Sequence, residues 1–202
     1  MAKPGRPRKD ANAGDARQRI IDATVAIISQ KGADAVTVRS VCEKSGLSNG
    51  TFYHHFANKD ELMMEFVHDS LFGEAQLNHP LDQIAERICD LYLHLLRGYM
   101  GMGKDFMKSF YSTNNTALSA YMGTHDGAFA PGTIMEKSEV EMRAAQDAGL
   151  VDPAADAHTI CCDICTIVKG CVFEWCLEDG RMDVEAALHR LVGNYLRPYL
   201  RG

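Results

Sequence analysis

A short run of polar and aromatic residues between Ser48 and His54 is suited to contact nucleic acid. Gly50 allows another molecule to approach the backbone closely, while Thr51, Tyr53 and His54 can donate hydrogen bonds to phosphate oxygens or base edges. A recognition helix presents such groups from its N-terminal end in the major groove of DNA. The run therefore predicts a DNA-reading helix, provided that the segments around it are also helical.

A second cluster could hold a metal or respond to oxidation. His158, Cys161, Cys162 and Cys165 recur at steps of three and four residues, so a helix would place them on one face. Thiolate and imidazole groups bind zinc or copper(I), and low-pKa thiols form redox switches. Cysteine is also a small apolar residue that is often buried in helix packing. The sequence leaves both interpretations open, and we expect no cofactor.

Charge is distributed unevenly along the chain of 202 residues, whose formal net charge is -6. Residues 1–60 carry ten Lys or Arg and six Asp or Glu, whereas residues 61–202 carry 11 and 21. An excess of positive charge at one end suggests that this end meets a polyanion. Residues 1–14 of the chain are rich in Pro, Gly, Lys and Arg, and we expect them to form a disordered basic arm. Arg6, within Gly5-Arg6-Pro7, could enter a minor groove, or the arm could only aid solubility.

Helix signals surround the polar run. Apolar residues recur with helical spacing over 15–31, and Gly32 closes that segment. Thr37 is a good N-cap for a second helix, which Gly46 should end, and Ser48 should cap a third. Two helices joined by a short turn that contains glycine form a helix-turn-helix. Asn58 should cap a fourth helix, which we expect to run to about residue 77.

These residues together resemble the DNA-binding domain of TetR-type transcriptional regulators. The resemblance covers about 15–76 and is carried by Lys31-Gly32, Val36-Thr37-Val38, Ser45-Gly46-Leu47-Ser48, Gly50-Thr51-Phe52-Tyr53-His54-His55-Phe56 and Lys59-Asp60-Glu61-Leu62. Asn49 departs from the lysine that is common in the family, which changes the expected DNA contacts. Ser40-Val41-Cys42 departs from a common acidic-isoleucine-alanine step.

The resemblance implies which residues meet DNA. Backbone anchors would be Thr37, Thr51, Tyr53, His54 and Lys59, and candidates for reading bases would be Arg39, Asn49 and Gly50. With Ser48 and the arm residue, the expected DNA-binding set is Thr37, Arg39, Ser48, Asn49, Gly50, Thr51, Tyr53, His54, Lys59 and Arg6.

The remaining chain, 77–202, also has helical patterns, so we expect an all-α fold with about nine helices in total. Helices are expected over about 81–97, 104–111, 133–148, 153–177 and 183–199, with turns at Gly98 to Gly103 and a loop over 112–132. The resemblance implies that the last two helices, 153–177 and 183–199, form a homodimer interface. A dimer would place two recognition helices about 34–36 Å apart on a near-palindromic operator.

The resemblance further implies a small-molecule cavity in the C-terminal domain. Methionines and aromatic residues with polar tips suit a mostly apolar ligand. Candidate lining residues are Tyr92, Met100, Phe106, Phe110, Tyr111, Tyr121, Met122, His125, Phe129 and Trp175.

Other classes of function find little support in the sequence. There is no Ser-His-Asp grouping and no phosphate-binding glycine loop after a strand, so we do not expect an enzyme. An apolar run long enough to span a membrane and a secretory signal are both absent, and seven scattered cysteines favour reduced thiols in the cytoplasm. The favoured function is a transcriptional repressor released from DNA by a ligand. The alternative is a redox- or metal-responsive regulator that uses Cys161, Cys162 and Cys165.

Overall fold

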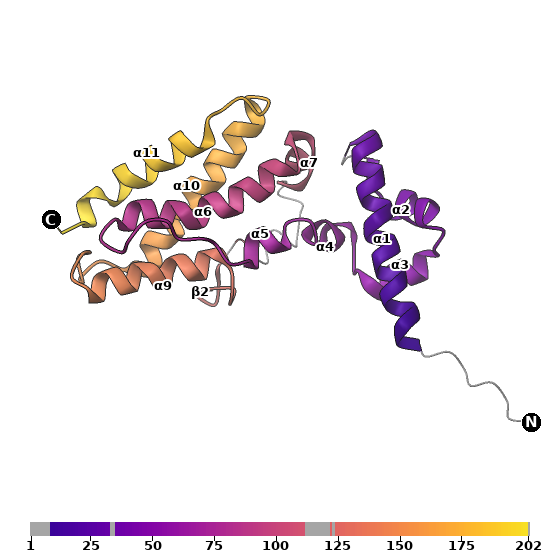
Figure 1. Cartoon of the computed structure of the whole chain (residues 1–202), viewed down its shortest axis with the longest axis horizontal. Helices are drawn as coiled ribbons and strands as arrows, with labels where there is room; N and C mark the ends of the chain where they lie inside the picture. Colours follow the sequence, from indigo (N-terminus) through magenta and orange to yellow (C-terminus); the bar gives the residue numbers. More distant parts are fainter. Residues whose placement is uncertain (1–8, 33–34, 112–121, 123, 202) are drawn as a thin grey trace, which may run out of the picture. The chain divides into compact units, whose positions relative to one another are not determined.

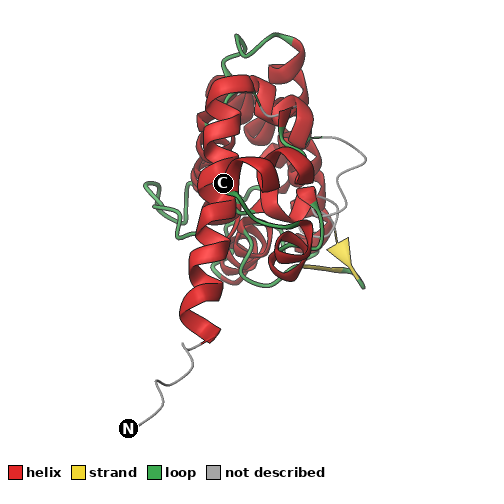
Figure 2. Cartoon of the chain, turned by 90° about the vertical axis from the view of Figure 1, so that its right-hand side faces the viewer, coloured by secondary structure: helices red, strands yellow, loops and turns green. Residues whose placement is uncertain are grey.

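The structure is a computed structural model that describes residues 9–32, 35–111, 122 and 124–201. Its contacts divide the chain into two compact units, Met1–Met63 and Met64–Gly202. Ten α-helices and one pair of two-residue strands occur among the described residues, which confirms the all-α prediction (Figures 1 and 2). None of the described helices is both long and apolar enough to cross a membrane. The domain division near residue 76 stays a prediction.

Local capping defines the helices of the N-terminal unit. These helices are α1 (Lys9–Lys31), α2 (Val38–Ser45), α3 (Asn49–His55) and α4 (Lys59–Met64). Thr37 caps α2 by accepting from the Ser40 amide, and Ser48 caps α3 by accepting from the Thr51 amide. Gly46 ends α2 with a φ of 69°, a left-handed conformation that favours glycine. These three predicted caps are confirmed.

Helix α1 begins at Lys9, whereas the sequence predicts an unstructured arm to residue 14. Alanines at 11 and 13 are strong helix formers and let the helix extend by nearly two turns. Residues 1–8, including Arg6, lie outside the described part of the chain.

The predicted fourth helix is two helices in the structure, which corrects that prediction. Helix α4 ends at Met64, and α5 (His68–Phe72) follows after a turn. The residues between them include no glycine or proline, so nothing local signals the break. Tertiary packing supplies the reason, because Val67 is buried and the Phe66 ring packs edge-on against Phe106, with centroids 6.3 Å apart.

The C-terminal unit is built around α6 (Ile84–Gly101). This helix packs against α9 (Ile134–Asp147) and α11 (Val184–Leu196), and α10 (Ala157–Leu177) packs against the same two helices (Figure 1). Helix α7 (Lys104–Phe110) contacts α6 and α10, and the 3-10 turn Arg197–Tyr199 follows α11. Eleven of the 18 residues of α6 are buried, so this helix supplies the centre of the core.

Three predictions in this unit were wrong. Helix α6 continues through Gly98, because this glycine permits close packing: a Cβ there would lie 1.6 Å from the Ser70 Oγ of α5. Helix α10 begins at Ala157 and not at Pro153, since the Asp156 carboxylate caps it by accepting from the His158 amide. The segment predicted as a loop contains strands β1 (Thr124–His125) and β2 (Ala128–Phe129).

A buried carboxylate holds the segment that precedes α6. Asp90 is 8% exposed, and its Oδ2 accepts from the backbone amides of Asn78 and His79 at 2.7 and 3.0 Å. Burial alone would raise the pKa of Asp90, but hydrogen bonds from the His79 ring and these amides lower it below its ordinary value. Ionised Asp90 therefore stabilises this connection.

We predict that Asp90→Asn lowers the free energy of unfolding by roughly 1–3 kcal/mol at neutral pH, since two buried amide donors lose a charged acceptor. Because the folded pKa of Asp90 lies below its unfolded value, its contribution is complete above about pH 4 and is lost as the pH falls through the folded pKa. Urea denaturation at several pH values should show the difference from wild type shrinking on acidification. Asp82→Asn, an exposed neighbour, is the control, and equal effects of both substitutions would contradict the assignment.

Candidate functional site

The predicted DNA-binding residues of the N-terminal unit form an accessible set. Ser48, Asn49, Gly50, Tyr53 and His54 are exposed on α3 or its cap. Thr37 and Arg39 are exposed at the start of α2, while Thr51 and Lys59 are half-buried. All of them come from the first turns of α2, α3 and α4, apart from Tyr53 and His54, which follow within α3.

Tyr53 and Gly50 are the residues whose presence the fold itself does not explain. The Tyr53 side chain is 56% exposed, and its ring meets only the edge of Phe52 among the recorded ring contacts, at 5.5 Å between centroids. A Cβ at Gly50 would meet only the Ser48 Oγ, at 3.7 Å, which is ordinary contact. Glycine within a helix costs about 0.5–1 kcal/mol relative to alanine. A close approach by another molecule would account for both residues.

Four candidate contacts already have partners within the chain. The Ser48 and Thr51 hydroxyls lie 2.9 Å apart and pair with each other. The Thr37 hydroxyl accepts from the Ser40 amide at 3.0 Å, and the Arg39 Nε donates to Glu43 at 2.8 Å. The Arg39 side chain is 86% exposed, so water screens its ion pair with Glu43. The guanidinium can therefore exchange Glu43 for a phosphate. The Thr37 hydroxyl also donates to the Ser40 Oγ at 3.1 Å, an exposed hydrogen bond that it would have to exchange for one to a phosphate.

Two arginines of α1 that the sequence did not single out hold α2 and α3 in place. Arg19 donates to the Ser45 carbonyl at 2.6 Å, which satisfies the C-terminal end of α2. The Arg17 guanidinium lies over the Phe56 ring, 5.4 Å from its centroid. Phe56 and Phe52 are themselves buried. The arginines gave no sequence signal because their partners lie 26 or more residues away.

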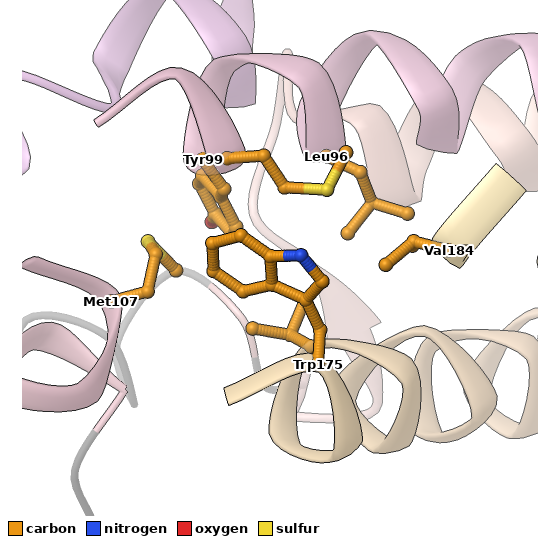
Figure 3. A pocket seen from close by; sticks show the side chains of 7 residues that line it. Leu96, Tyr99, Met107, Trp175 and Val184 are labelled. Atoms are coloured by element: carbon orange, nitrogen blue, oxygen red, sulfur yellow. The ribbon is translucent and has the colours of Figure 1, made fainter. Parts of the chain in front are cut away.

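An apolar pocket lies between α6, α7, α10 and α11 in the C-terminal unit. Its empty volume is about 180 Å³, part of which is open to solvent, and it is too narrow for a water molecule. Figure 3 shows the Trp175 indole at its centre, with Tyr99 and Met107 on one side and Leu96 and Val184 on the other. A ligand would have to move these side chains apart, which unbranched Met100 and Met107 can do at low cost.

Three of the predicted lining residues border this pocket or a neighbouring hollow in the described part of the chain. Met100 and Trp175 line the pocket, and Tyr111 lines the hollow, which lies between α7 and α10. Tyr92, Phe106, Phe110, Met122 and Phe129 are buried core residues. Tyr121 and the side chain of His125 lie outside the described part of the structure. The sequence missed Leu96, Tyr99, Met107, Val172 and Val184, because they look like ordinary core positions.

The cysteine cluster does not form a metal site in the described residues, where no group of three or more His, Cys, Asp or Glu has suitable geometry. Burial raises the pKa of Cys161 to about 12 and also raises the pKa of Cys165. Raised pKa values suppress the reactive thiolate. His158 instead contacts Glu139 at 2.7 Å and the Cys162 Sγ at 3.5 Å. These contacts favour packing of the cysteines over metal binding or redox sensing.

Comparison with known proteins places the N-terminal unit in a described family. The family of bacterial regulatory proteins named tetR matches residues 20–66. The uncharacterized HTH-type transcriptional regulator YvdT of Bacillus subtilis is 34% identical over 71 residues, which cover 35% of this chain and 34% of YvdT. The chain thus spans about a third of that relative.

Likeness over the whole length is more distant. The probable acrEF/envCD operon repressor of Escherichia coli is 23% identical over 207 residues, covering 96% of this chain and 90% of that protein. The crystal structure of Thermus thermophilus FadR, a TetR family transcriptional repressor in complex with lauroyl-CoA, superposes with a TM-score of 0.59 at 16% identity. That superposition covers 92% of this chain and 96% of FadR, and shows a shared fold.

We predict that Gly50→Ala leaves the fold intact, or stabilises it by up to about 1 kcal/mol, and weakens DNA binding at least tenfold. The methyl group has room within the protein but would obstruct a close approach from outside. Thermal unfolding and binding to a duplex isolated with the wild-type protein measure the two effects. Gly101→Ala, whose added methyl group would meet nothing within 4 Å, is the control. Unchanged DNA affinity in Gly50→Ala would contradict the role of Gly50.

Proposed function

Because the chain belongs to the TetR family of bacterial regulatory proteins, we propose that it is a DNA-binding transcriptional repressor that a small molecule releases from its operator. The observation that carries the proposal is the capped α2–α3 pair with Gly50, Tyr53 and His54 exposed together on α3. Regulators of this family are generally non-enzymatic, and we propose no catalytic role.

DNA contacts divide into two kinds in this proposal. Thr37, Thr51, Tyr53, His54 and Lys59 bind backbone phosphates and fix the register of the protein on the duplex. Arg39, Asn49 and Gly50 lie against base edges in the major groove, where Asn can form a bidentate pair with adenine. Ser48 keeps its cap while the amide end of α3 faces phosphate, and Arg6 adds a minor-groove contact.

Two copies of the chain pair through α10 and α11 in this proposal. The exposed residues Thr166, Gly170, Phe173 and Leu177 follow one another at helical spacing, so they form one stripe along α10. Phe173 and Leu177 are 57% and 64% exposed, which is unusual for large apolar side chains and marks an interaction surface.

Glycines support this choice of surface. Gly170 in α10 and Gly193 in α11 lie within helices, and a Cβ at either position would meet nothing within 4 Å. Glycine lowers helix stability, and packing within the chain does not explain why these two positions are glycine. Close approach of helices from a second copy would explain it.

The C-terminal unit is proposed to bind the small molecule that controls DNA affinity. FadR of Thermus thermophilus, which has the same fold, binds lauroyl-CoA. The apolar pocket around Trp175 is the proposed site in this chain. A ligand acts as an inducer if it binds the DNA-incompetent state better than the other, and about 1–3 kcal/mol of coupling is sufficient.

We predict that the protein selects a near-palindromic DNA site from genomic fragments. Two recognition helices should protect half-sites centred about 10–10.5 base pairs apart, or a multiple of that spacing. Affinity should fall steeply with salt because phosphate contacts release counterions. Sequencing of fragments retained by the protein, followed by footprinting, measures this. Retained fragments that share no two-fold related sequence would contradict the proposal.

The dimer surface gives a separate prediction. Phe173→Asp should shift the protein from dimer to monomer at micromolar concentration and lower its operator affinity, since it buries a charge in an apolar interface. Sedimentation velocity measures the association state. Val140→Asp is a matched control, because Val140 on α9 is 59% exposed but lies outside the proposed interface. If both variants stay dimeric, α10 does not form the interface.

A further inference from the structure

The Tyr111 hydroxyl is a buried polar group without a hydrogen-bond partner among the described residues. Tyr111 follows the last residue of α7, and burial raises the pKa of its phenol well above the ordinary value. A buried hydroxyl that makes no hydrogen bond destabilises the fold, because it has lost its hydration without gaining a partner. Such groups are few in native proteins, and a bound molecule that pairs with the hydroxyl is one explanation.

A second phenol beside it is poorly satisfied. Tyr99 is 1% exposed, and its hydroxyl donates to the Met122 thioether sulfur at 3.5 Å, which is a weak acceptor. The Tyr99 ring packs edge-on against Phe110, the residue before Tyr111, with centroids 6.1 Å apart. The two phenols are near enough that Tyr99 contributes to the raised pKa of Tyr111. By contrast, the Tyr92 hydroxyl pairs with Ser138 at 3.3 Å.

The two phenols border the space in which a ligand would lie. Tyr99 lines the pocket around Trp175, Tyr111 lines the hollow between α7 and α10, and Met107 lines both. Met107 thus forms the wall between the two spaces. A methionine side chain has three rotatable bonds and can turn aside, which would join the pocket to the hollow.

Charge is disfavoured in this region. Burial raises the pKa of Tyr99, Tyr111 and Cys165, even though the neighbouring Lys169 lowers the pKa of Cys165. Lys108, which lines the hollow, donates to Asp179 at 3.1 Å, and Lys104 donates to the same carboxylate at 2.6 Å. A ligand carboxylate would lose its hydration here and would have to displace Asp179 to reach either lysine.

We propose that the Tyr99 and Tyr111 hydroxyls converge on one uncharged carbonyl oxygen of an apolar ligand, such as a ketone, ester or lactone. This inference rests on the proposed role of the C-terminal unit as a small-molecule site and specifies its ligand class. Two neutral donors around one acceptor select for a carbonyl group, since an analogue without it would leave both hydroxyls unpaired. The apolar walls hold the hydrocarbon portion.

Trp175, the only tryptophan of the chain, reports on occupancy because it lies at the centre of the pocket. Its fluorescence should be titrated on the full-length protein, without DNA, with three probes of similar shape. These are 2-octanone, 2-methyl-1-octene, in which a methylene group replaces the carbonyl oxygen, and octanoate. We expect saturable binding of 2-octanone, and binding of the alkene and octanoate that is at least about tenfold weaker.

Phenylalanine variants locate the contact. Tyr99→Phe and Tyr111→Phe should each weaken 2-octanone binding about tenfold, and the control Tyr92→Phe should change it less than twofold. Tyr111→Phe should also unfold at the same temperature as wild type or higher when no ligand is present, because it removes an unpaired buried hydroxyl. A lower unfolding temperature would identify a structural hydroxyl and overturn the proposal.

Three further outcomes would overturn the proposal. They are equal binding of octanoate or the alkene, unchanged binding by both Tyr99→Phe and Tyr111→Phe, and no binding of 2-octanone up to its solubility. Operator binding by the ligand-free variants is measured separately. If the wild-type protein binds its operator but does not prefer 2-octanone over the alkene and octanoate, the ligand class alone is overturned. If the wild-type protein binds no operator, the result counts against the proposed repressor function.

Discussion

The reading helix α3 depends on the burial of Phe52 and Phe56. It has seven residues, and helices shorter than about 12 residues are marginal in water. Its shape therefore comes from packing: both rings are at most 2% exposed and lie 5.8 Å apart between centroids, and Arg17 of α1 covers Phe56. Because Phe52 and Phe56 anchor one face of α3, the opposite face does not have to pack against the protein. It carries an exposed tyrosine, a histidine and a glycine, which are therefore available to the DNA proposed as partner.

Glycines separate internal packing from external contact across the chain. Gly98 is explained within the fold, since any larger residue would meet Ser70 and push α5 away from α6. Gly50, Gly170 and Gly193 have free space around them and yet sit within helices. Each costs helix stability without an internal benefit. The three positions fall on the proposed DNA surface and the proposed dimer surface. Gly101 also has free space around it, but it is the last residue of α6, where a glycine disturbs the helix least.

Features governed by neighbouring residues were predictable from the sequence, and those governed by distant residues were not. Thr37, Gly46 and Ser48 act on groups within four residues, so their types and spacing were sufficient to place α2 and α3. The break between α4 and α5 arises from packing of Phe66 against Phe106, 40 residues away. Pocket residues such as Tyr99 and Val184 are separated by more than 80 residues, so no sequence pattern unites them.

One missed element did have a local signal. Asp126 and Gly127 both have positive φ, at 52° and 78°, which is the geometry of a two-residue hairpin turn between β1 and β2. Asp-Gly between short strands is a known signature of that turn. The sequence nevertheless predicts only a loop here, because the two strands have two residues each, too few to show the alternation of apolar and polar residues that marks a strand.

The closed state of the pocket bears on how a ligand could control DNA binding. A space too narrow for water must widen before it admits a molecule, so the liganded protein differs from the described one at least in Met107 and its neighbours. Whatever widening costs is subtracted from ligand affinity. In the proposed ligand complex, the Tyr111 hydroxyl offsets part of that cost, because it is unpaired in the closed state and would gain a hydrogen bond to the ligand. The Tyr111 hydroxyl destabilises the ligand-free closed state and would be paired in the ligand-bound open state. It would therefore increase the difference in ligand affinity between the closed and open states, and that difference limits how far a ligand can shift the protein between them.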